Sequence, residues 1–252
     1  MSTDTTLSGQ TCIVTGAAQG IGKAIATTLA ARGANVVVAD LNGDAAAATA
    51  AEIGGNSLGV TVDVTDRAQV DAMVATTVET YGRIDVLVNN AGWDKVSPFL
   101  DLDPAVWKRI IDINLVGTLN CAHAVALQMK EQDGHSTIIN IGSDAARVGS
   151  SGEAVYSACK GGVVAFTKTL ARELARYGVT ANAVCPGPAD TPLFAQISEE
   201  NPKLRTALEK SIPLRRLAQP EDLANAVAFF ASPDTSYVTG QTFSVSGGLT
   251  MI

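Results

Sequence analysis

Short apolar runs alternate with amphipathic stretches along almost the whole chain. The first run, Thr11–Thr15, leads through a glycine-rich turn into a helical pattern over 21–32, and Asn35–Asp40 forms the second run. The same alternation predicts strands over 58–62, 84–88, 137–141, 179–184 and 241–245, and helices over 44–53, 66–81, 104–130, 155–177 and 220–231. Residues 186–216 show a less regular pattern.

Apolar strands that are separated by helices favour parallel pairing, with the helices packed on both faces of one sheet. No linker, repeat or low-complexity segment interrupts the alternation, and α/β chains of about 200–250 residues often form one domain. We therefore expect residues 1–252 to form a single-domain Rossmann α/β fold. It should contain a doubly wound, seven-stranded parallel sheet with helices on both faces.

The composition narrows the functional classes. Hydrophobic residues make up 46% of the 252 residues, which excludes a disordered chain, and 18 Lys+Arg against 25 Asp+Glu give a net charge of −7. That charge disfavours nucleic-acid binding. We also expect no membrane partner, because no run of about 18 apolar residues occurs, and no secretory signal in the polar segment Met1–Gln10.

The four cysteines stand far apart, and none belongs to a C-x-x-C pair: Cys12, Cys121, Cys159 and Cys185. With only two histidines besides, the spacing of potential ligands predicts no metal site. Buried free thiols in a reducing cytoplasm are the simpler interpretation. A Ser-His-Asp hydrolase is weakly supported, since the chain has no G-x-S-x-G motif.

The turn after the first strand contains three glycines in the spacing G-x-x-x-G-x-G. Glycines at such a turn let backbone N–H groups approach a pyrophosphate at the positive end of the following helix. A tight strand-to-helix turn without a ligand is the alternative, but the position between a strand and a helix favours a dinucleotide site. We expect the cofactor to be bound by Gly16, Gln19, Gly20, Ile21 and Gly22.

Asp40 ends the second strand, 18 residues after Gly22. A carboxylate at this place accepts hydrogen bonds from the ribose hydroxyls of adenosine and repels a 2′-phosphate. No Lys or Arg occurs from Ala39 to Asn42 to bind that phosphate, so NAD is the expected cofactor rather than NADP. The alternative role for Asp40 is to cap the next helix.

Two later strand ends carry further candidates for cofactor binding. Asp63 and Val64 follow the third strand, and Asn90, Ala91 and Gly92 follow the fourth. Because open α/β sheets bind ligands at the carboxyl ends of their strands, we expect all five to contact the cofactor. Asp63 would accept a hydrogen bond from the adenine amino group, or else cap the following helix.

The candidate catalytic residues are Asn114, Ser143, Tyr156 and Lys160. Tyr156 and Lys160 are four residues apart and share one helix face, which by itself is common on solvated helices. Their position, thirteen residues after Ser143 in a chain with a nucleotide turn, favours catalysis. We expect the Lys160 ammonium to lower the pKa of Tyr156 and make it an acid or base. Ser143 would bind the substrate oxygen, and Asn114 would hold a proton-relay water.

Together these motifs resemble the short-chain dehydrogenase/reductase family over about residues 9–251. The resemblance rests on Thr15-Gly16-x-x-x-Gly20-x-Gly22, Asn89-Asn90-Ala91-Gly92, Asn114, Ser143, Tyr156-x-x-x-Lys160, Pro186-Gly187 and Thr191. It implies a tetramer of Rossmann subunits and reversible carbonyl–alcohol chemistry. It also implies that Tyr156 exchanges the proton, that Lys160 binds the nicotinamide ribose, and that Pro186, Gly187 and Thr191 line the nicotinamide.

A narrower resemblance concerns the substrate. The segments 92–94, 143–156, 185–191 and 244–251 are similar to family members that oxidise a cyclic 2-hydroxyacyl-CoA, such as 2-hydroxycyclohexanecarboxyl-CoA, with NAD. A 3-oxoacyl-(acyl-carrier-protein or CoA) reductase is the alternative, and a non-catalytic dinucleotide-binding module is a remote one. The complete set of Ser143, Tyr156 and Lys160 favours an enzyme over such a module.

The roles of some residues near the expected active site stay open. Arg147 either contacts a CoA phosphate or a thioester carbonyl, or forms an ion pair at an interface or within the loops. Trp93 either packs or recognises substrate. Residues 193–208 are expected to form a mobile lid.

Apolar residues on more than one face of the helix over 155–177 support the expected homotetramer. These residues are Val163, Val164, Phe166 and Leu170. The apolar, glycine-rich segment 246–252 would pack at a second subunit interface.

Overall fold

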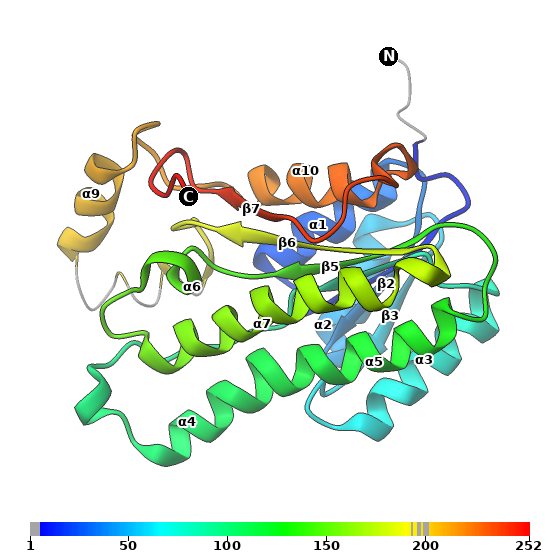
Figure 1. The fold of residues 1–252 in the computed structure, drawn as a ribbon, viewed down its shortest axis with the longest axis horizontal. Helices are drawn as coiled ribbons and strands as arrows, with labels where there is room; N and C mark the ends of the chain where they lie inside the picture. The colour runs from blue at the N-terminus through cyan, green and yellow to red at the C-terminus, as the bar shows by residue number, and fades with distance from the viewer. Residues whose placement is uncertain (1–5, 193, 196–197, 199–201) are drawn as a thin grey trace.

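Seven parallel strands form one sheet through the centre of the molecule (Figure 1). The computed structural model describes residues 6–192, 194–195, 198 and 202–252. The strands are β1 (Thr11–Thr15), β2 (Asn35–Asp40), β3 (Ser57–Thr61), β4 (Val86–Asn89), β5 (Ser136–Ile141), β6 (Val179–Pro186) and β7 (Thr242–Val245). Their order is β3-β2-β1-β4-β5-β6-β7, and every neighbouring pair is parallel. The predicted doubly wound Rossmann fold is confirmed.

Helices cover both faces of the sheet (Figure 1). One face packs against α1 (Gly20–Ala31), α2 (Gly43–Ile53) and α10 (Pro220–Ala231) in a first core cluster. The other face packs against α3 (Arg67–Tyr81), α5 (Gly117–Met129) and α7 (Ala154–Glu173) in a second. Successive side chains of a strand point to opposite faces, so Val14 belongs to the first cluster and Ile13 to the second.

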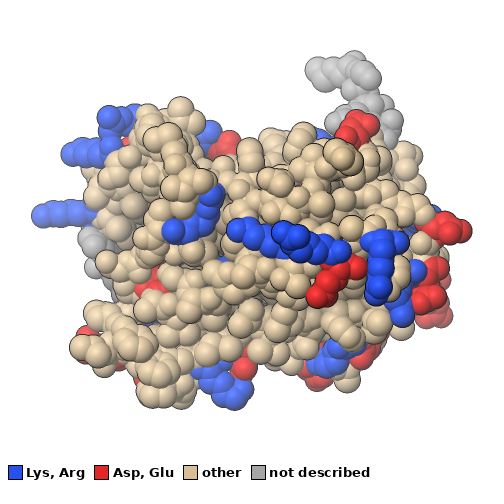
Figure 2. All heavy atoms as spheres, in the orientation of Figure 1, with Lys and Arg blue, Asp and Glu red and all other residues tan. Residues whose placement is uncertain are grey.

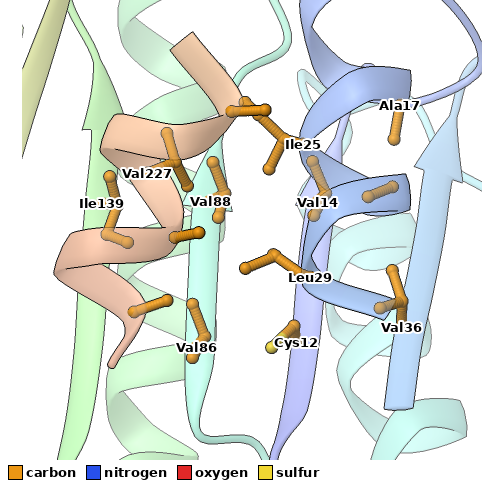
Figure 3. Close-up of a cluster of buried hydrophobic side chains, with 14 of the residues drawn as sticks. Cys12, Val14, Ala17, Ile25, Leu29, Val36, Val86, Val88, Ile139 and Val227 are labelled. Carbon is orange, nitrogen blue, oxygen red and sulfur yellow. The ribbon is translucent and has the colours of Figure 1, made fainter. Parts of the chain in front are cut away.

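Figure 3 shows how the first core cluster holds α1 and α10 on the sheet. Ile25 and Leu29 of α1 lie over β1 near Val14, and Val227 of α10 lies near Val88 of β4. All of these side chains are fully buried. Burying an apolar side chain of this size stabilises the fold by about 1.5–3 kcal/mol. This packing therefore fixes the start of α1 at the carboxyl end of β1. The four cysteines are also buried, with free thiols, as the sequence predicts.

The structure departs from the predicted elements where regular periodicity ends. The helix predicted over 104–130 consists of α4 (Pro104–Ile111), a π-helical turn over Asp112–Val116, and α5. A short helix, α6 (Ala145–Val148), follows β5, and the less regular stretch contains α9 (Pro202–Ser211). A π turn inserts one residue without changing the hydrophobic pattern on either side, and short helices hold few periodic positions. The predicted lid over 193–208 falls partly outside the described residues, and its part from 202 onward belongs to α9.

The helix that runs through Pro104–Met129 passes a length-and-hydropathy test for a membrane span, although the sequence predicted no such segment. It has 26 residues, a mean hydropathy of 1.5, and 44% of the tested window is buried. Cys121, Val125 and Met129 of this helix pack in the second core cluster. A helix that packs on a sheet passes the same test, so this finding is weak evidence for a membrane span.

Charge is unevenly distributed over the surface. Figure 2 shows a row of Lys and Arg side chains across the middle of one face, over the second half of α7. Lys168 and Arg172 of α7 and Arg176 in the turn after it are exposed. The net charge of −7 therefore does not describe this face.

The strand order reverses direction at β1, which lies between β2 and β4. The chain leaves β1 toward one side of the sheet and later leaves β4 toward the other, so the loops after these two strands diverge. Ligands of open α/β folds bind in the crevice that such a reversal opens at the carboxyl ends of the strands. The residues predicted to bind a cofactor follow β1, β2, β3 and β4 at this edge.

Candidate active site

Two adjoining cavities lie along the carboxyl edge of the sheet. The first, about 720 Å³, begins at the glycine turn and extends past the ends of β2 and β3. The second, about 710 Å³, lies beyond the ends of β5 and β6 and contains Ser143, Tyr156 and Lys160. The two cavities share the lining residues Ile21, Asn90, Gly92, Trp93 and Thr191. The predicted cofactor residues line one or both of them, so the structure brings that set together.

The glycine turn is built so tightly that side chains would not fit. Gly16 has a φ of +62°, and a Cβ there would lie 2.8 Å from the Cα of Ala91. A Cβ on Gly22 would lie 2.1 Å from the carbonyl oxygen of Gly16. The turn therefore brings bare backbone to the start of α1, where N–H groups face the first cavity. This cradle fits the pyrophosphate of a dinucleotide.

Thr15 and Asn90 connect this turn to the loop after β4. The Thr15 hydroxyl oxygen accepts hydrogen bonds from the backbone N–H groups of Asn90 (3.0 Å) and Ala91 (3.1 Å). In return, the Asn90 side-chain amide donates to the carbonyl oxygens of Thr15 (2.9 Å) and Gly16 (3.0 Å). Asn90 therefore shapes the cavity wall mainly by holding the glycine turn, a role that its position after a strand did not reveal.

Asp40 lines the first cavity at the end of β2. One carboxylate oxygen accepts from the N–H of Ala18 (3.0 Å) and the other from the N–H of Asn42 (3.0 Å). These bonds fix the carboxylate in the cavity wall and leave further lone pairs for ligand hydroxyls. The alternative cap role for Asp40 is wrong, because the Asn42 side chain caps α2 by accepting from the N–H of Ala45.

Asp63 and Val64 also line the first cavity, beyond β3. One oxygen of Asp63 accepts from both the N–H and the hydroxyl of Thr65, at 2.9 and 2.7 Å. Asp63 is not the cap of the following helix, since the Asp66 side chain accepts from the first turn of α3. The structure thus places Asp63 in the wall of the first cavity and fixes its orientation through Thr65, while its contact with adenine stays a prediction.

Ser143, Tyr156 and Lys160 meet in the second cavity, brought together by the end of β5 and the first turns of α7. The Ser143 hydroxyl oxygen accepts from the N–H of Ala145 at 3.1 Å, which leaves its own proton free to donate. The Lys160 ammonium donates to the carbonyl oxygen of Ile141 at 2.8 Å and lies 5.6 Å from the centre of the Tyr156 ring.

The expected net lowering of the Tyr156 pKa is wrong in this structure. Burial raises the pKa of the Tyr156 phenol, the carboxylates of Glu153 and Asp94 raise it further, and a hydrogen bond with Ser143 offsets part of the rise. Burial also lowers the pKa of Lys160 to about 8. Desolvation penalises the charged form of each group, so it favours a neutral phenol beside a readily deprotonated amine. Tyr156 is thus kept protonated.

Asn114 lies behind the cavities rather than in them. Its side chain is fully buried in the π-helical turn. The amide donates to the carbonyl oxygens of Trp93 (2.6 Å) and Ile110 (2.9 Å), and the amide oxygen accepts from the N–H of Trp93 (3.4 Å). A Cβ on Gly92 would lie 3.0 Å from this oxygen and 3.6 Å from the Lys160 nitrogen. Asn114 therefore holds the Trp93 backbone next to Lys160, and its predicted water remains a prediction.

Pro186, Gly187 and Thr191 line the second cavity, as predicted for the nicotinamide side. Arg147 donates to the Ser244 hydroxyl of β7 at 2.5 Å, which in turn donates to Asp144 at 2.5 Å. This supports the loop interaction for Arg147 rather than a contact with CoA. Trp93 lines both cavities while the Arg109 guanidinium lies 4.1 Å from its ring centre.

Three functional features were not predicted from the sequence: the Thr15 hydroxyl bridge, the burial of the Asp94 carboxylate, and the place of Glu153 in the wall of the second cavity. Asp94 and Glu153 were expected only to lie near the active-site loops. Asp94 and Glu153 come from loops that are 59 residues apart in the chain. The only signal for them was their place beside the predicted active-site loops, and that place does not reveal burial.

Comparison with known proteins agrees with this geometry. A family model described as Enoyl-(Acyl carrier protein) reductase matches residues 16–250. A crystal structure titled short-chain dehydrogenase/reductase SDR:Glucose/ribitol dehydrogenase, from Brucella melitensis, is 34% identical with a TM-score of 0.93 and covers 100% of both chains. The chain belongs to the short-chain dehydrogenase/reductase family. It is therefore an oxidoreductase of CH–OH groups, which excludes the non-catalytic module.

Relatives in this family share nearly the full length of the chain. The 3-oxoacyl-[acyl-carrier-protein] reductase of Synechocystis sp. is 44% identical and covers 98% of this chain and 99% of its own. Subunit BbsD of the (2S)-[(R)-hydroxy(phenyl)methyl]succinyl-CoA dehydrogenase of Thauera aromatica is 38% identical over 96% of this chain and 97% of its own. The structure of a 3-ketoacyl-(acyl-carrier-protein) reductase from Brucella melitensis, complexed with NADH, is 33% identical with a TM-score of 0.90. The match covers 97% of this chain and 99% of that chain.

The glycine cradle yields a prediction for cofactor binding. Gly22→Ala places a methyl group against the Gly16 carbonyl and should weaken NADH affinity by about tenfold or more, since about 1.4 kcal/mol of lost contact suffices. Gly161→Ala is the matched control, because a Cβ there meets only the carbonyl oxygen of Ala146, at 3.9 Å. Fluorescence titration of both variants, with circular dichroism to verify folding, checks the prediction. Equal affinities would show that the turn does not carry the pyrophosphate.

Proposed function

We propose that this short-chain dehydrogenase/reductase reduces the 3-oxo group of an acyl thioester to a 3-hydroxyl group, reversibly, with NADH. The observation that carries the proposal is the half-buried Tyr156 phenol, kept neutral by desolvation, in a cavity that also holds Ser143 and Lys160. The names of the relatives, which act on 3-oxoacyl-carrier-protein and acyl-CoA thioesters, support the substrate class. This reverses the order of preference that the sequence resemblance gave.

The second cavity suits the acyl part of such a substrate. Beyond the polar catalytic groups, its wall is formed mainly by apolar side chains, namely Val96, Ala145, Val148, Phe194, Leu204, Leu208 and Leu249. These side chains come from the loop after β4, from α6, from the segment that includes α9, and from the C-terminal segment. An apolar wall of this kind favours a hydrocarbon chain or ring over a charged or sugar-like substrate.

The roles of the catalytic residues follow from their protonation. When bound, the nicotinamide supplies the hydride to the carbonyl carbon. The Tyr156 phenol donates its proton to the carbonyl oxygen, and the Ser143 hydroxyl donates a hydrogen bond to the same oxygen as charge develops there. The Lys160 ammonium, with its pKa near 8, lies close enough to the tyrosine ring to stabilise the phenolate that remains. Oxidation reverses these proton movements.

A cyclic 2-hydroxyacyl-CoA is the second candidate substrate. The ring hydroxyl of 2-hydroxycyclohexanecarboxyl-CoA stands on the carbon β to the thioester, so its chemistry is that of a 3-hydroxyacyl thioester. Val96 and Val148 give the cavity apolar walls on both the β4 loop and α6, which suits a ring as well as a chain.

Kinetics with matched thioesters test the function directly. We expect NADH-dependent reduction of linear 3-oxoacyl-CoA or 3-oxoacyl-carrier-protein substrates. The cyclic thioester is assayed beside them as the alternative substrate. Tyr156→Phe should lower kcat by about 10²–10⁴-fold while NADH binding survives, because general acid catalysis contributes that much and the glycine turn is unchanged. Tyr237→Phe, which alters an exposed tyrosine, is the control. Near-normal turnover by Tyr156→Phe would contradict the proposed roles, and inactivity toward every thioester would refute the substrate class.

We also propose NAD as the cofactor, on the fixed carboxylate of Asp40 and the NADH complex of the Brucella relative. Two basic residues line the same cavity, but both are engaged: Lys108 pairs with Asp112, and Arg109 lies over Trp93. Neither is therefore free to attract a 2′-phosphate.

Substitution of Asp40 tests the cofactor preference. Asp40→Ala removes the repulsion of a 2′-phosphate and should reduce the NADH/NADPH ratio of kcat/KM by about tenfold or more. Asp44→Ala, which removes an exposed carboxylate on the neighbouring helix, should leave the ratio unchanged. An unsubstituted enzyme that uses both cofactors equally would show that Asp40 does not select NAD.

We further propose a cytoplasmic homotetramer. Val163 and Leu170 are buried within the subunit, so these two residues of α7 do not argue for a subunit contact as expected. Exposed apolar side chains lie instead on α5, α10 and β7: Leu119, Leu127, Phe229 and Phe243. The free thiols of the four cysteines suit a reducing compartment. Light scattering should give a mass of about four times 25.9 kDa, and a mass of one chain would refute the assembly.

A further inference from the structure

Asp94, in the loop after β4, carries a carboxylate that the catalytic roles above do not use. Both of its oxygens are screened from solvent, and among the described residues no donor, the nearby backbone N–H of Lys95 included, forms a well-directed hydrogen bond with either. A buried carboxylate without donors is costly unless it carries a proton itself. The arrangement therefore calls for a neutral acid at Asp94, with a nearby acceptor for its hydrogen.

Glu153 is placed to be that acceptor. It occupies the N-cap position of α7, three residues before Tyr156, yet its side chain makes no capping hydrogen bond. Glu153 instead lines the second cavity together with Tyr156. The positive end of α7 stabilises a negative charge at this position.

The loops that carry the two carboxyl groups are held together. The N–H of Ser97 donates to the carbonyl oxygen of Gly152 at 2.9 Å. Gly152 has a φ of +83°, and a Cβ there would lie 2.8 Å from Val96. This backbone hydrogen bond and the close packing of Gly152 against the Val96 side chain hold the Asp94 loop against the residue that precedes Glu153.

We propose that Asp94 and Glu153 form a carboxylic acid–carboxylate pair that shares one proton beside Tyr156. The pair sets the charge beside Tyr156: it carries one negative charge when it holds the shared proton and two negative charges when it has lost that proton. Asp94 and Glu153 are thus positioning residues that govern how readily Tyr156 releases its proton. This inference rests on the function proposed above.

The charges around the pair agree with this assignment. Burial, with Glu153 close by, raises the pKa of Asp94 to about 7. Tyr156 and Cys159 face the pair from α7, and the negative charges of the pair raise the pKa of the tyrosine. On the other elements, Lys95 contributes a backbone N–H, and the Arg109 guanidinium of α4 lies over the neighbouring Trp93 ring. Lys160 donates to Ile141.

The pH dependence of thermal unfolding tests the pair without any substrate. A carboxyl group whose pKa is about 7 when folded and about 3.9 when unfolded loses stabilising free energy as pH rises through this range. The Tm of Asp94→Asn minus the Tm of the unsubstituted enzyme should therefore be larger at pH 8.5 than at pH 5.5, by about 3 °C or more. Asp101→Asn, which alters an exposed carboxylate in the same loop region, should show no such gain.

The pH profile of oxidation tests the effect on Tyr156. Above about pH 7 the unsubstituted pair carries two negative charges, and Asp94→Asn and Glu153→Gln each leave one. The rise of kcat/KM with pH for a 3-hydroxyacyl thioester should therefore be displaced to lower pH in both variants, by about half a unit or more. A merely structural defect would lower the whole profile without displacing it. Asp101→Asn should leave the profile in place.

The two measurements separate failure of the pair from failure of the proposed function. A pH-independent Tm difference for Asp94→Asn would overturn the shared proton, whatever the substrate. An undisplaced profile in both variants would overturn the effect on Tyr156. If the unsubstituted enzyme is inactive on thioesters but Asp94→Asn shows the expected pH-dependent Tm difference, the proposed function is refuted and the carboxyl pair is supported.

Discussion

The close approach of two backbone segments at the carboxyl ends of β1 and β4 is the constraint on which the site depends. The glycine turn after β1 lies against Ala91 with no room for a Cβ at Gly16 or Gly22. Hydrogen bonds between Thr15 and Asn90 fasten the two segments in both directions. Because Asn90 lines both cavities, the same contact sets the wall of the cofactor cleft and the wall of the catalytic cavity.

Burial is the second organising effect, and it acts on the catalytic pair in opposite directions. It raises the pKa of the Tyr156 phenol and lowers that of the Lys160 ammonium to about 8. The carboxyl groups of Asp94 and Glu153 add to the effect on the tyrosine, and a hydrogen bond with Ser143 offsets part of it. A site with these properties keeps the proton on the Tyr156 phenol, and in the proposed reduction its transfer to a carbonyl oxygen depends on Ser143 and Lys160, which stabilise the phenolate that forms.

The sequence predicts much of this structure because its signals are local. Alternating strands and helices give the seven parallel strands, and Gly16, Gly20 and Gly22 mark the turn by their spacing alone. The π turn at Asn114 was not predictable, because it preserves the hydrophobic pattern on both sides. The direction of the Tyr156 pKa shift was also mispredicted, because four-residue spacing shows that Lys160 is near but not how deeply both groups are buried. Asp94 and Glu153 approach each other only through tertiary folding.

Burial keeps Tyr156 protonated and lowers the pKa of Lys160 to about 8, within the working pH range. The pH dependence of kcat/KM for NADH-driven reduction of a 3-oxoacyl thioester tests it most directly, since that ratio reports ionisations of the free enzyme. We expect kcat/KM to be higher below pH 8 than above it, because it should fall through an apparent pKa of about 8 as Lys160 loses its proton. Tyr156 should cause no further loss of kcat/KM up to pH 10. A profile that stays flat through pH 10, or one that rises with pH, would contradict it.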